Sequence, residues 1–262
     1  MAVKVDIERV HKQYGAEGDA HFVHALEDVS FALEDGEFVS LLGPSGCGKS
    51  TLLHIVAGFE QASAGTVRVN GKPVAGPGAD RGMVFQDYAL FPWMTVIENV
   101  TFGLRIKKLP QEECERIARE YIALVGLAGF EHRFPHQLSG GMRQRSALAR
   151  SVANDPEVLL MDEPLAAIDA LTRNALQEEI LKVCDARDGR PRKSVLYVTH
   201  SIEEAVFLSD RIVVMTPRPG RILDVVHVPF GRSRGDDTRL SPEFQRLAGE
   251  IWSTLKSHVK PI

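Results

Sequence analysis

A glycine-rich stretch with a lysine and a serine at fixed spacing is the first feature that could do chemistry. In EFVSLLGPSGCGKST, residues 37–51, the pattern G-x-x-x-x-G-K-S follows an apolar run and precedes a helix-like segment. The glycines allow backbone conformations that residues with a Cβ atom rarely adopt, so successive N–H groups can point at phosphate oxygens. Lys49 is then placed to bridge the β- and γ-phosphates, and the Ser50 hydroxyl to ligate Mg²⁺. The stretch predicts a phosphate-binding loop (P-loop).

We expect this loop to contact the nucleotide along its whole length. The residues predicted to bind there are Gly43, Pro44, Ser45, Gly46, Cys47, Gly48, Lys49, Ser50 and Thr51. Cys47 occupies a free position of the motif, and no histidine or other base stands beside it in the sequence. We therefore interpret Cys47 as a tolerated small residue and not as a nucleophile.

Two further strand-like runs end in ionisable residues. VLLM is followed by Asp162 and Glu163, and VLYVT is followed by His200. Ligands of open α/β sheets bind beyond the carboxyl ends of the strands. We expect Asp162 to hold Mg²⁺, Glu163 to act as general base on an attacking water, and His200 to hydrogen-bond the γ-phosphate. On its own, an Asp-Glu-Pro turn is usually a solvated loop, and a single histidine usually has a structural role. The P-loop upstream favours a functional role for Asp162, Glu163 and His200.

A second glycine pair begins another helix-like segment, LSGGMRQR, residues 138–145. Ser139 can cap this helix, and Gly140 and Gly141 leave its first N–H groups unobstructed. Such an N-terminus favours an anion through its dipole and its free donors. On its own, an ordinary serine N-cap would explain the stretch. The local pattern does not say whose phosphate the helix would meet.

The elements that position these residues change character along the chain. The first third has strand-like alternation, as at residues 3–7, and Asn70-Gly71 is a strong hairpin signal. Two helical segments follow from residue 111, and strand-like and helical segments alternate from residue 157, with a capping box predicted at Ser201 and Glu204. We expect helices at 111–127, 143–154, about 171–186, from 201, and 241–258, and strands at 157–164, 194–200, 211–215 and 221–228. The alternation predicts an α/β fold with a parallel sheet.

Composition limits the class of protein. The chain has 262 residues, is 44% hydrophobic and carries a formal net charge of −4, which is ordinary for a soluble globular protein and argues against non-specific nucleic-acid binding. Its three cysteines are far apart and fit neither a disulfide framework nor a zinc spacing. The N-terminus lacks a signal-peptide pattern, and no run reaches the ~18 apolar residues of a membrane span. We expect a cytoplasmic protein whose membrane role, if any, comes through a partner.

Together, the motifs resemble a known family. The P-loop, Gln86 in MVFQDY, LSGGMRQR and LLMDEP, followed by Asp169 and His200, occur in the order and approximate spacing of ATP-binding subunits of ABC transporters. The resemblance covers nearly the whole chain, and LSGG combined with a P-loop and a following DEP is highly specific. GPGADRGMVFQDYALFPWMTVIENVTFGL and PRPGRI resemble importers of the nitrate, sulfonate and taurine group.

The resemblance implies an architecture and partners. It implies a single nucleotide-binding domain, 1–262, with an α/β ATPase core, a mostly parallel sheet, an antiparallel β subdomain, an inserted helical subdomain at about 87–156 and a tail from about 229. It further implies ATP and Mg²⁺, and a head-to-tail homodimer that sandwiches two ATP molecules. The partners implied are multi-span permease subunits and, indirectly, a solute-binding protein, with the chain peripheral on the cytoplasmic face of the cell membrane.

Several residue roles are also implied by the resemblance. Tyr14 would stack on adenine, although a strand-end aromatic explains it too. Gln86 would touch Mg²⁺ or the attacking water and report to the membrane partner. Asp169 would belong to a loop that crosses the dimer interface, where the usual S/G-A-L-D is Ala166-Ala167-Ile168-Asp169 in this chain. Ser139, Gly140 and Gly141 would close on the γ-phosphate held by the other subunit.

The middle of the chain leaves two interpretations open. The aromatic run comprises Phe85, Tyr88, Phe91 and Trp93. It is either the core of the helical subdomain or a docking surface for a helix of a membrane subunit. A basic cluster follows, comprising Arg105, Lys107 and Lys108, and we interpret it as a solvated face.

Two functions of other classes compete with transport. ABC-type ATPases that act on DNA or ribosomes carry long coiled coils or two cassettes, whereas this chain has one cassette and no sustained heptads. A non-catalytic nucleotide-binding regulator would be expected to lack Glu163 or His200, and both are present.

Overall fold

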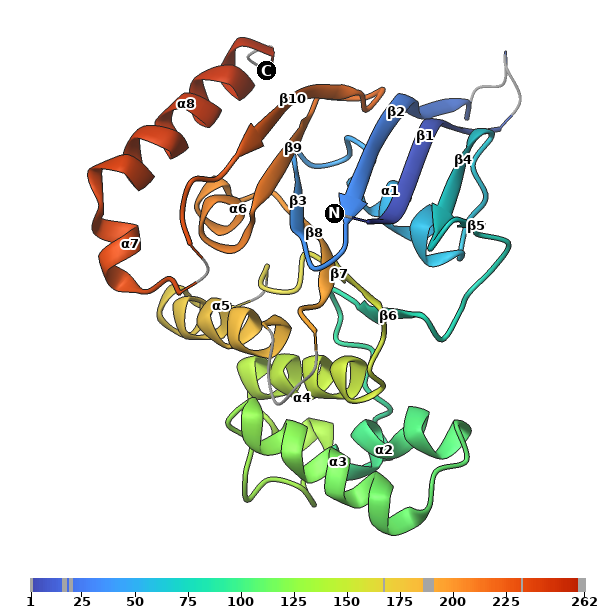
Figure 1. Cartoon of the computed structure of the whole chain (residues 1–262), viewed down its shortest axis with the longest axis vertical. Helices are drawn as coiled ribbons and strands as arrows, with labels where there is room; N and C mark the ends of the chain where they lie inside the picture. The colour runs from blue at the N-terminus through green and yellow to red at the C-terminus, as the bar shows by residue number, and fades with distance from the viewer. Residues whose placement is uncertain are drawn as a thin grey trace.

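The computed structural model describes residues 2–15, 18, 21–166, 168–185, 191–231 and 233–258, and it contains two β-sheets (Figure 1). The smaller sheet is antiparallel and has the strand order β2-β1-β4-β5. Its strands are β1 (Val3–Tyr14), β2 (Val23–Glu34), β4 (Ala64–Val69) and β5 (Lys72–Pro73). Asn70 and Gly71 form the turn between β4 and β5, both with positive φ, as the hairpin signal predicts.

The larger sheet has the strand order β10-β9-β3-β8-β7-β6. Its strands are β3 (Phe38–Leu42), β6 (Arg81–Val84), β7 (Val158–Asp162), β8 (Ser194–Thr199), β9 (Arg211–Met215) and β10 (Ile222–His227). All neighbours pair in parallel except β9 and β10. Every residue of β3, β7 and β8 is buried, as expected of parallel strands covered on both faces. The predicted α/β fold is confirmed.

The two faces of this sheet pack into separate cores. In β3, Val39 and Leu41 contact a core formed with helix α1 (Lys49–Ala57) and the antiparallel sheet, whereas Phe38 and Leu42 face the other core. The alternation follows from the period of two along a strand. Figure 1 shows α1 between the two sheets. The P-loop that precedes α1 is therefore held between two packed layers.

Three helices lie between β6 and β7 in the chain and stack at one end of the molecule (Figure 1). They are α2 (Val96–Ile106), α3 (Gln111–Leu124) and α4 (Gly140–Ala153), and a short 3-10 helix, Pro135–Gln137, precedes α4. Helix α2 was missing from the sequence prediction. Its signal is a capping box, because Glu98 N donates to the Thr95 hydroxyl while Thr95 N donates to the Glu98 carboxylate.

The remaining helices flank the sheet on the side away from the antiparallel sheet (Figure 1). They are α5 (Ala170–Cys184), α6 (Ile202–Leu208), α7 (Asp236–Leu240) and α8 (Pro242–His258), of which α7 was not predicted. The Ser201 capping box is half right. The Ser201 hydroxyl accepts from Glu204 N, but the Glu204 carboxylate accepts from the hydroxyls of Tyr197 and Thr199 instead of reaching back.

The segment after β10 is fastened by one buried arginine. The Arg234 guanidinium donates to the carbonyls of Val206, Phe207, Ser209, Phe230 and Gly231. Arg239 then stacks on the Phe207 ring with its guanidinium carbon 3.4 Å from the ring centroid. None of the helices among the described residues combines the length and apolar character that crossing a membrane requires.

Candidate nucleotide site

The strand register brings the three chemically distinctive strand ends together. Strand β8 lies between β3 and β7, with Leu42 opposite Thr199 and Asp162 opposite Val198. The P-loop follows β3, His200 follows β8, and Glu163 follows β7. All three segments therefore emerge side by side at the carboxyl edge of the sheet, where the sequence analysis expects the ligand.

The P-loop has the backbone that a phosphate cradle requires. Gly46 and Gly48 have φ of 75° and 100°, in the left-handed region. A Cβ atom at Gly48 would lie 2.7 Å from Leu26 Cδ2, so a larger residue would collide with β2. Lys49 is 4% exposed, and its Nζ donates to the carbonyls of Gly43 at 2.7 Å and Pro44 at 3.0 Å. The ammonium is thus held inside the loop.

Cys47, the free position of the motif, is buried in the loop. Burial raises the pKa of its thiol, although nearby Lys49 opposes that shift. A thiol with a raised pKa is a poor nucleophile at neutral pH. This environment agrees with the interpretation of Cys47 as a small packing residue.

Ser50 and Asp162, two of the residues predicted to hold Mg²⁺, contact each other. The Ser50 hydroxyl donates to Asp162 Oδ1 at 2.8 Å. Burial raises the pKa of Asp162, and the neighbouring charge of Glu163 adds to this, while Ser50 and His54 oppose it. The described residues hold no cluster of three or more His, Cys, Asp or Glu side chains for a metal. One carboxylate and one hydroxyl fit Mg²⁺, which takes few protein oxygens and completes its shell with phosphate oxygens and water.

Glu163 and His200 contact each other at the same edge. His200 Nδ1 lies 3.1 Å from Glu163 Oε2, with side-chain exposures of 54% and 19%. Glu163 has φ of 42°, a conformation that is uncommon for a non-glycine residue and that is seen at functional sites. Its N–H donates to Val198 O on β8, which fixes the direction of the chain after β7.

A hollow of about 210 Å³ opens over the P-loop. The residues that line it are Tyr14, Val23, Ala25, Ser45, Gly46, Gly48, Lys49, Ser50, Thr51, Glu163 and Arg218. Tyr14 is partly buried, its hydroxyl donates to Glu60 at 2.5 Å, and Lys12 lies over its ring. Burial raises the pKa of the Tyr14 hydroxyl, and Glu60 adds to the shift. One ring is therefore positioned beside the phosphate cradle.

The second anion-binding motif lies elsewhere. Ser139 caps α4 through a hydrogen bond from Met142 N, and Gly141 approaches α5 so closely that a Cβ atom would lie 2.9 Å from Thr172. Asp169 caps α5 by accepting from Thr172 N. Among the described residues, those that line the hollow include neither the motif at 139–141 nor Asp169. The motif at 139–141 is therefore not part of the hollow over this chain's own P-loop. Ala167 of the predicted interface loop lies outside the described residues.

Gln86 lies two residues beyond the end of β6 and is exposed. Because Val84 pairs with Met161, this position is at the same sheet edge as Asp162. Gln86 is not among the residues that line the hollow over the P-loop, so its predicted contact with Mg²⁺ or water stays a prediction.

Sequence reasoning missed two residues near the site. His54 Nε2 lies 3.7 Å from Asp162 Oδ2, and its place one helical turn after Ser50 was the available signal. Arg218 lines the hollow and donates to Gly46 O at 3.1 Å. Arg218 belongs to the PRPGRI segment, which indicates a resemblance to a group of importers but does not by itself predict a contact with the P-loop.

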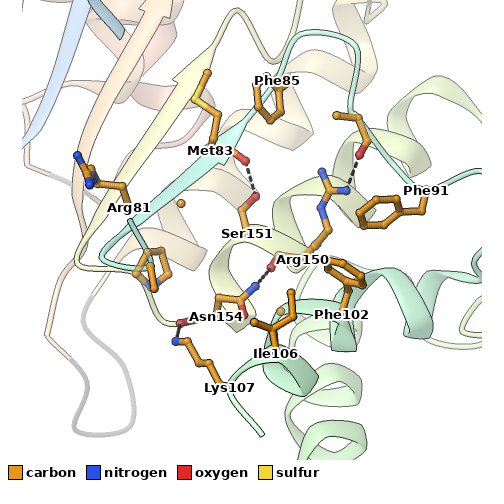
Figure 2. A pocket seen from close by; sticks show the side chains of 15 residues that line it. Arg81, Met83, Phe85, Phe91, Phe102, Ile106, Lys107, Arg150, Ser151 and Asn154 are labelled. Atoms are coloured by element: carbon orange, nitrogen blue, oxygen red, sulfur yellow. Dashed lines mark hydrogen bonds between the residues drawn. The ribbon is translucent and has the colours of Figure 1, made fainter. Parts of the chain in front are cut away.

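A second hollow, of about 410 Å³, lies between β6, α2 and α4 (Figure 2). We call it the helical-layer groove. The residues that line it are Ala79, Arg81, Gly82, Met83, Phe85, Ala89, Phe91, Phe102, Gly103, Ile106, Lys107, Arg150, Ser151, Asn154 and Pro156. Arg150 donates to the carbonyls of Tyr88 and Ala89, which fixes the segment after Gln86 to α4.

The groove changes two sequence interpretations. Phe85 and Phe91 line it, and Trp93 is 69% exposed, so the aromatic run is not simply a buried core. Lys107 is not a purely solvated cation, because its Nζ donates to Asn154 O and joins α2 to the end of α4.

Comparisons with known proteins agree with this geometry. A family model described as "ABC transporter" matches residues 26–166. An uncharacterised ABC transporter ATP-binding protein of Methanocaldococcus jannaschii, MJ0412, is 50% identical over 99% of this chain and 94% of its own length. The taurine import ATP-binding protein TauB of Pelagibacter ubique is 51% identical over 87% of this chain and 86% of its own.

Solved structures extend the likeness to three dimensions. One is the dimeric post-hydrolysis state of the ATP-binding cassette MJ0796 bound to ADP and phosphate. It is 32% identical, covers 87% of this chain and 100% of its own, and has a TM-score of 0.74.

Asp162→Asn is expected to raise the thermal midpoint of the nucleotide-free chain at about pH 7.5 and to abolish magnesium-dependent hydrolysis. Burial raises the pKa of Asp162, so its charged form destabilises the folded state, and asparagine removes that charge while still accepting from Ser50. As the pH falls through the raised pKa, Asp162 takes up a proton and the wild-type chain no longer carries the destabilising charge. The difference in thermal midpoint between the variant and the wild-type chain should therefore become smaller as the pH approaches the ordinary aspartate pKa of 3.8. Thermal unfolding at several pH values measures this.

The matched control is Asp224→Asn, which removes the charge of an exposed aspartate on β10 and should leave the midpoint nearly unchanged. An unchanged or lower midpoint for Asp162→Asn at neutral pH would contradict the expectation.

Proposed function

This chain belongs to the ABC transporter family, and we propose that its ATPase site powers the uptake of a small solute through separate membrane subunits. The observation that carries the proposal is the convergence of the P-loop, Asp162, Glu163 and His200 at one sheet edge. Two other chains of related sequence are named as taurine importers, which supports a sulfonate or a similar small anion as the solute.

We propose that hydrolysis proceeds by in-line attack of water on the γ-phosphate. Glu163 would accept the proton of that water, because its carboxylate is at the site and partly exposed. Lys49 would exchange its bonds to the Gly43 and Pro44 carbonyls for phosphate oxygens, and His200 would turn from Glu163 towards the γ-phosphate. Ser50, Asp162 and Gln86 would hold Mg²⁺, which when bound neutralises phosphate charge.

We further propose a head-to-tail homodimer with ATP at both interfaces. Ser139 is exposed at the start of α4 and lies outside the chain's own nucleotide hollow. A second chain can bring Ser139, Gly140 and Gly141 to the γ-phosphate, with Asp169 in the loop between the subunits. Tyr14 would stack on adenine. The dimeric assembly of the related cassette MJ0796 supports this arrangement.

The membrane partner is proposed to dock in the helical-layer groove. We propose that about residues 87–156 form a helical subdomain, which together with β6 forms the groove, and that about 229–262 form a separate tail. Apolar side chains of Phe102 and Ile106 and the cations Lys107 and Arg150 suit a short amphipathic helix with an acidic end (Figure 2). Gln86 and the groove are joined through the Arg150 hydrogen bonds, so docking and the nucleotide site share one segment. The chain would then be peripheral on the cytoplasmic face of the cell membrane and reach a solute-binding protein indirectly.

The alternative is an ABC-type ATPase that acts on DNA or ribosomes. A net charge of −4 provides no general attraction to nucleic acid. The taurine-importer names of relatives also favour transport.

Glu163→Gln is expected to bind ATP normally, to hydrolyse it at least ~100-fold more slowly and to accumulate as an ATP-bound dimer. The amide fills the same space but does not accept the proton of the attacking water. Turnover assays and size-exclusion chromatography with ATP measure the outcome. Glu157→Gln, at the other end of β7, should keep turnover. Near-normal hydrolysis by Glu163→Gln would show that Glu163 is not the general base.

Ser139→Arg is expected to spare nucleotide binding by the monomer and to lose ATP-dependent dimerisation. The bulky cation would sit where the helix start must approach the other chain's phosphate. Equilibrium nucleotide binding and sedimentation should be measured on the same preparation. Equal loss of binding and dimerisation would mean that the motif acts within its own chain.

Ile106→Glu is expected to release the chain from its permease while leaving the ATPase activity of the free subunit unchanged. Ile106 is 67% exposed in the groove, so the substitution adds a charge without disturbing the core. Co-purification with co-expressed candidate permease subunits measures association. Leu240→Glu, at an 80% exposed leucine on α7, is the control and should still co-purify. Retention of Ile106→Glu on the permease would exclude the groove as the docking site.

A further inference from the structure

The loop between β9 and β10, residues 216–221, packs directly against the P-loop. Gly220 N donates to Ala25 O at 2.9 Å, and Gly220 O accepts from Glu27 N at 3.0 Å, so the loop is tied to β2. A Cβ atom at Gly220 would lie 2.0 Å from Cys47 O. Only glycine permits this approach, and it places the β9–β10 loop against the back of the phosphate cradle.

Arg218 projects from this loop towards the nucleotide. Its Nε donates to Gly46 O at 3.1 Å, and its side chain lines the hollow over the P-loop. Within the described part of the chain, the guanidinium has no carboxylate partner within salt-bridge distance. Arg221, on the same loop, pairs instead with Glu27 at 2.6 Å. One arginine therefore fastens the loop, and the other keeps its terminal nitrogens available at the hollow.

Arg218 determines the sign of the net charge on the side chains that line the hollow. Three of the described lining residues have ionisable side chains of formal charge, namely Lys49, Glu163 and Arg218. Without Arg218, the single lysine and the single glutamate cancel. A nucleoside triphosphate with one Mg²⁺ still carries net negative charge, so the charge of Arg218 would add to the attraction that the backbone N–H groups of the P-loop provide. Arg218 gives the lining its net positive charge.

We propose that Arg218 is a further nucleotide-binding residue, whose terminal guanidinium nitrogens donate to the phosphate chain of ATP while its Nε holds the Gly46 carbonyl. The inference rests on the proposed function, since it takes the hollow over the P-loop as the ATP site. A planar guanidinium can make both contacts at once, because its donors form a fixed fork. Lysine has the charge but not the fork. The same arginine thus orders the cradle and contacts its ligand.

The test is an equilibrium titration of MgATP with Arg218→Ala, Arg218→Lys and the wild-type chain at low and high salt. We expect Arg218→Ala to bind roughly tenfold more weakly at low salt, as loss of a charge-assisted hydrogen bond predicts. The salt dependence of its Kd should also be shallower, because one phosphate contact is gone. Arg218→Lys should keep the salt dependence and lose only part of the affinity.

Two controls separate the possible failures. Arg221→Ala removes the neighbouring cation from the same loop and should change the Kd by less than about twofold. Lys49→Ala should lose ATP binding. If it still binds ATP, the hollow over the P-loop is not the ATP site and the proposed function fails at this point. If Lys49→Ala fails to bind but Arg218→Ala binds like wild type, the Arg218 proposal alone is overturned. The proposal is also overturned if the Kd of Arg218→Ala keeps the wild-type salt dependence, or if Arg221→Ala loses as much affinity for MgATP. Either result would mean that Arg218 only holds the loop in place.

Discussion

The parallel alignment of three fully buried strands is the constraint on which the site depends. Strands β3, β8 and β7 are adjacent and run the same way, so the segments that follow them must emerge at one edge. Residues from three distant parts of the sequence are therefore brought together by strand order alone. The two apolar cores on the sheet's faces hold the register, because a one-residue slip would turn buried side chains towards the opposite core.

Four ionisable groups at this edge have polar partners before any ligand binds. Lys49 donates to backbone carbonyls, Asp162 accepts from Ser50, and Glu163 contacts His200, so each ionisable group has a polar partner in the free chain. Phosphate and metal binding can therefore proceed by exchange of partners rather than by exposing unpaired charge. Such an arrangement keeps the nucleotide-free site folded while leaving the groups close to the positions that the reaction requires.

The sequence predicted the parts of the site that follow short rules. Spacing in the sequence identifies the P-loop, the acids after VLLM and the histidine after VLYVT. The order of the strands in the sheet makes these residues neighbours. Helix α2 is absent from the sequence prediction although Thr95 and Glu98 form a capping box, because β-branched residues such as Val96, Ile97 and Val100 have weak helix propensity and the helix depends on their burial. The Glu204 half of the other capping box failed since Tyr197 and Thr199, brought close by β8, compete for its carboxylate. Arg218 could not be placed, because its contact depends on packing between segments 172 residues apart.

The fastening of the tail by Arg234 bears on how this segment can diverge. Its five acceptors are main-chain carbonyls, at positions 206, 207, 209, 230 and 231. Every amino acid supplies a carbonyl, so side chains at these five positions can drift without removing an acceptor. Position 234 has no such freedom, because no other side chain offers five donors in a plane. The attachment therefore depends on the side chain at position 234 and on the backbone at the five acceptor positions, and it places no demand of its own on the side chains there.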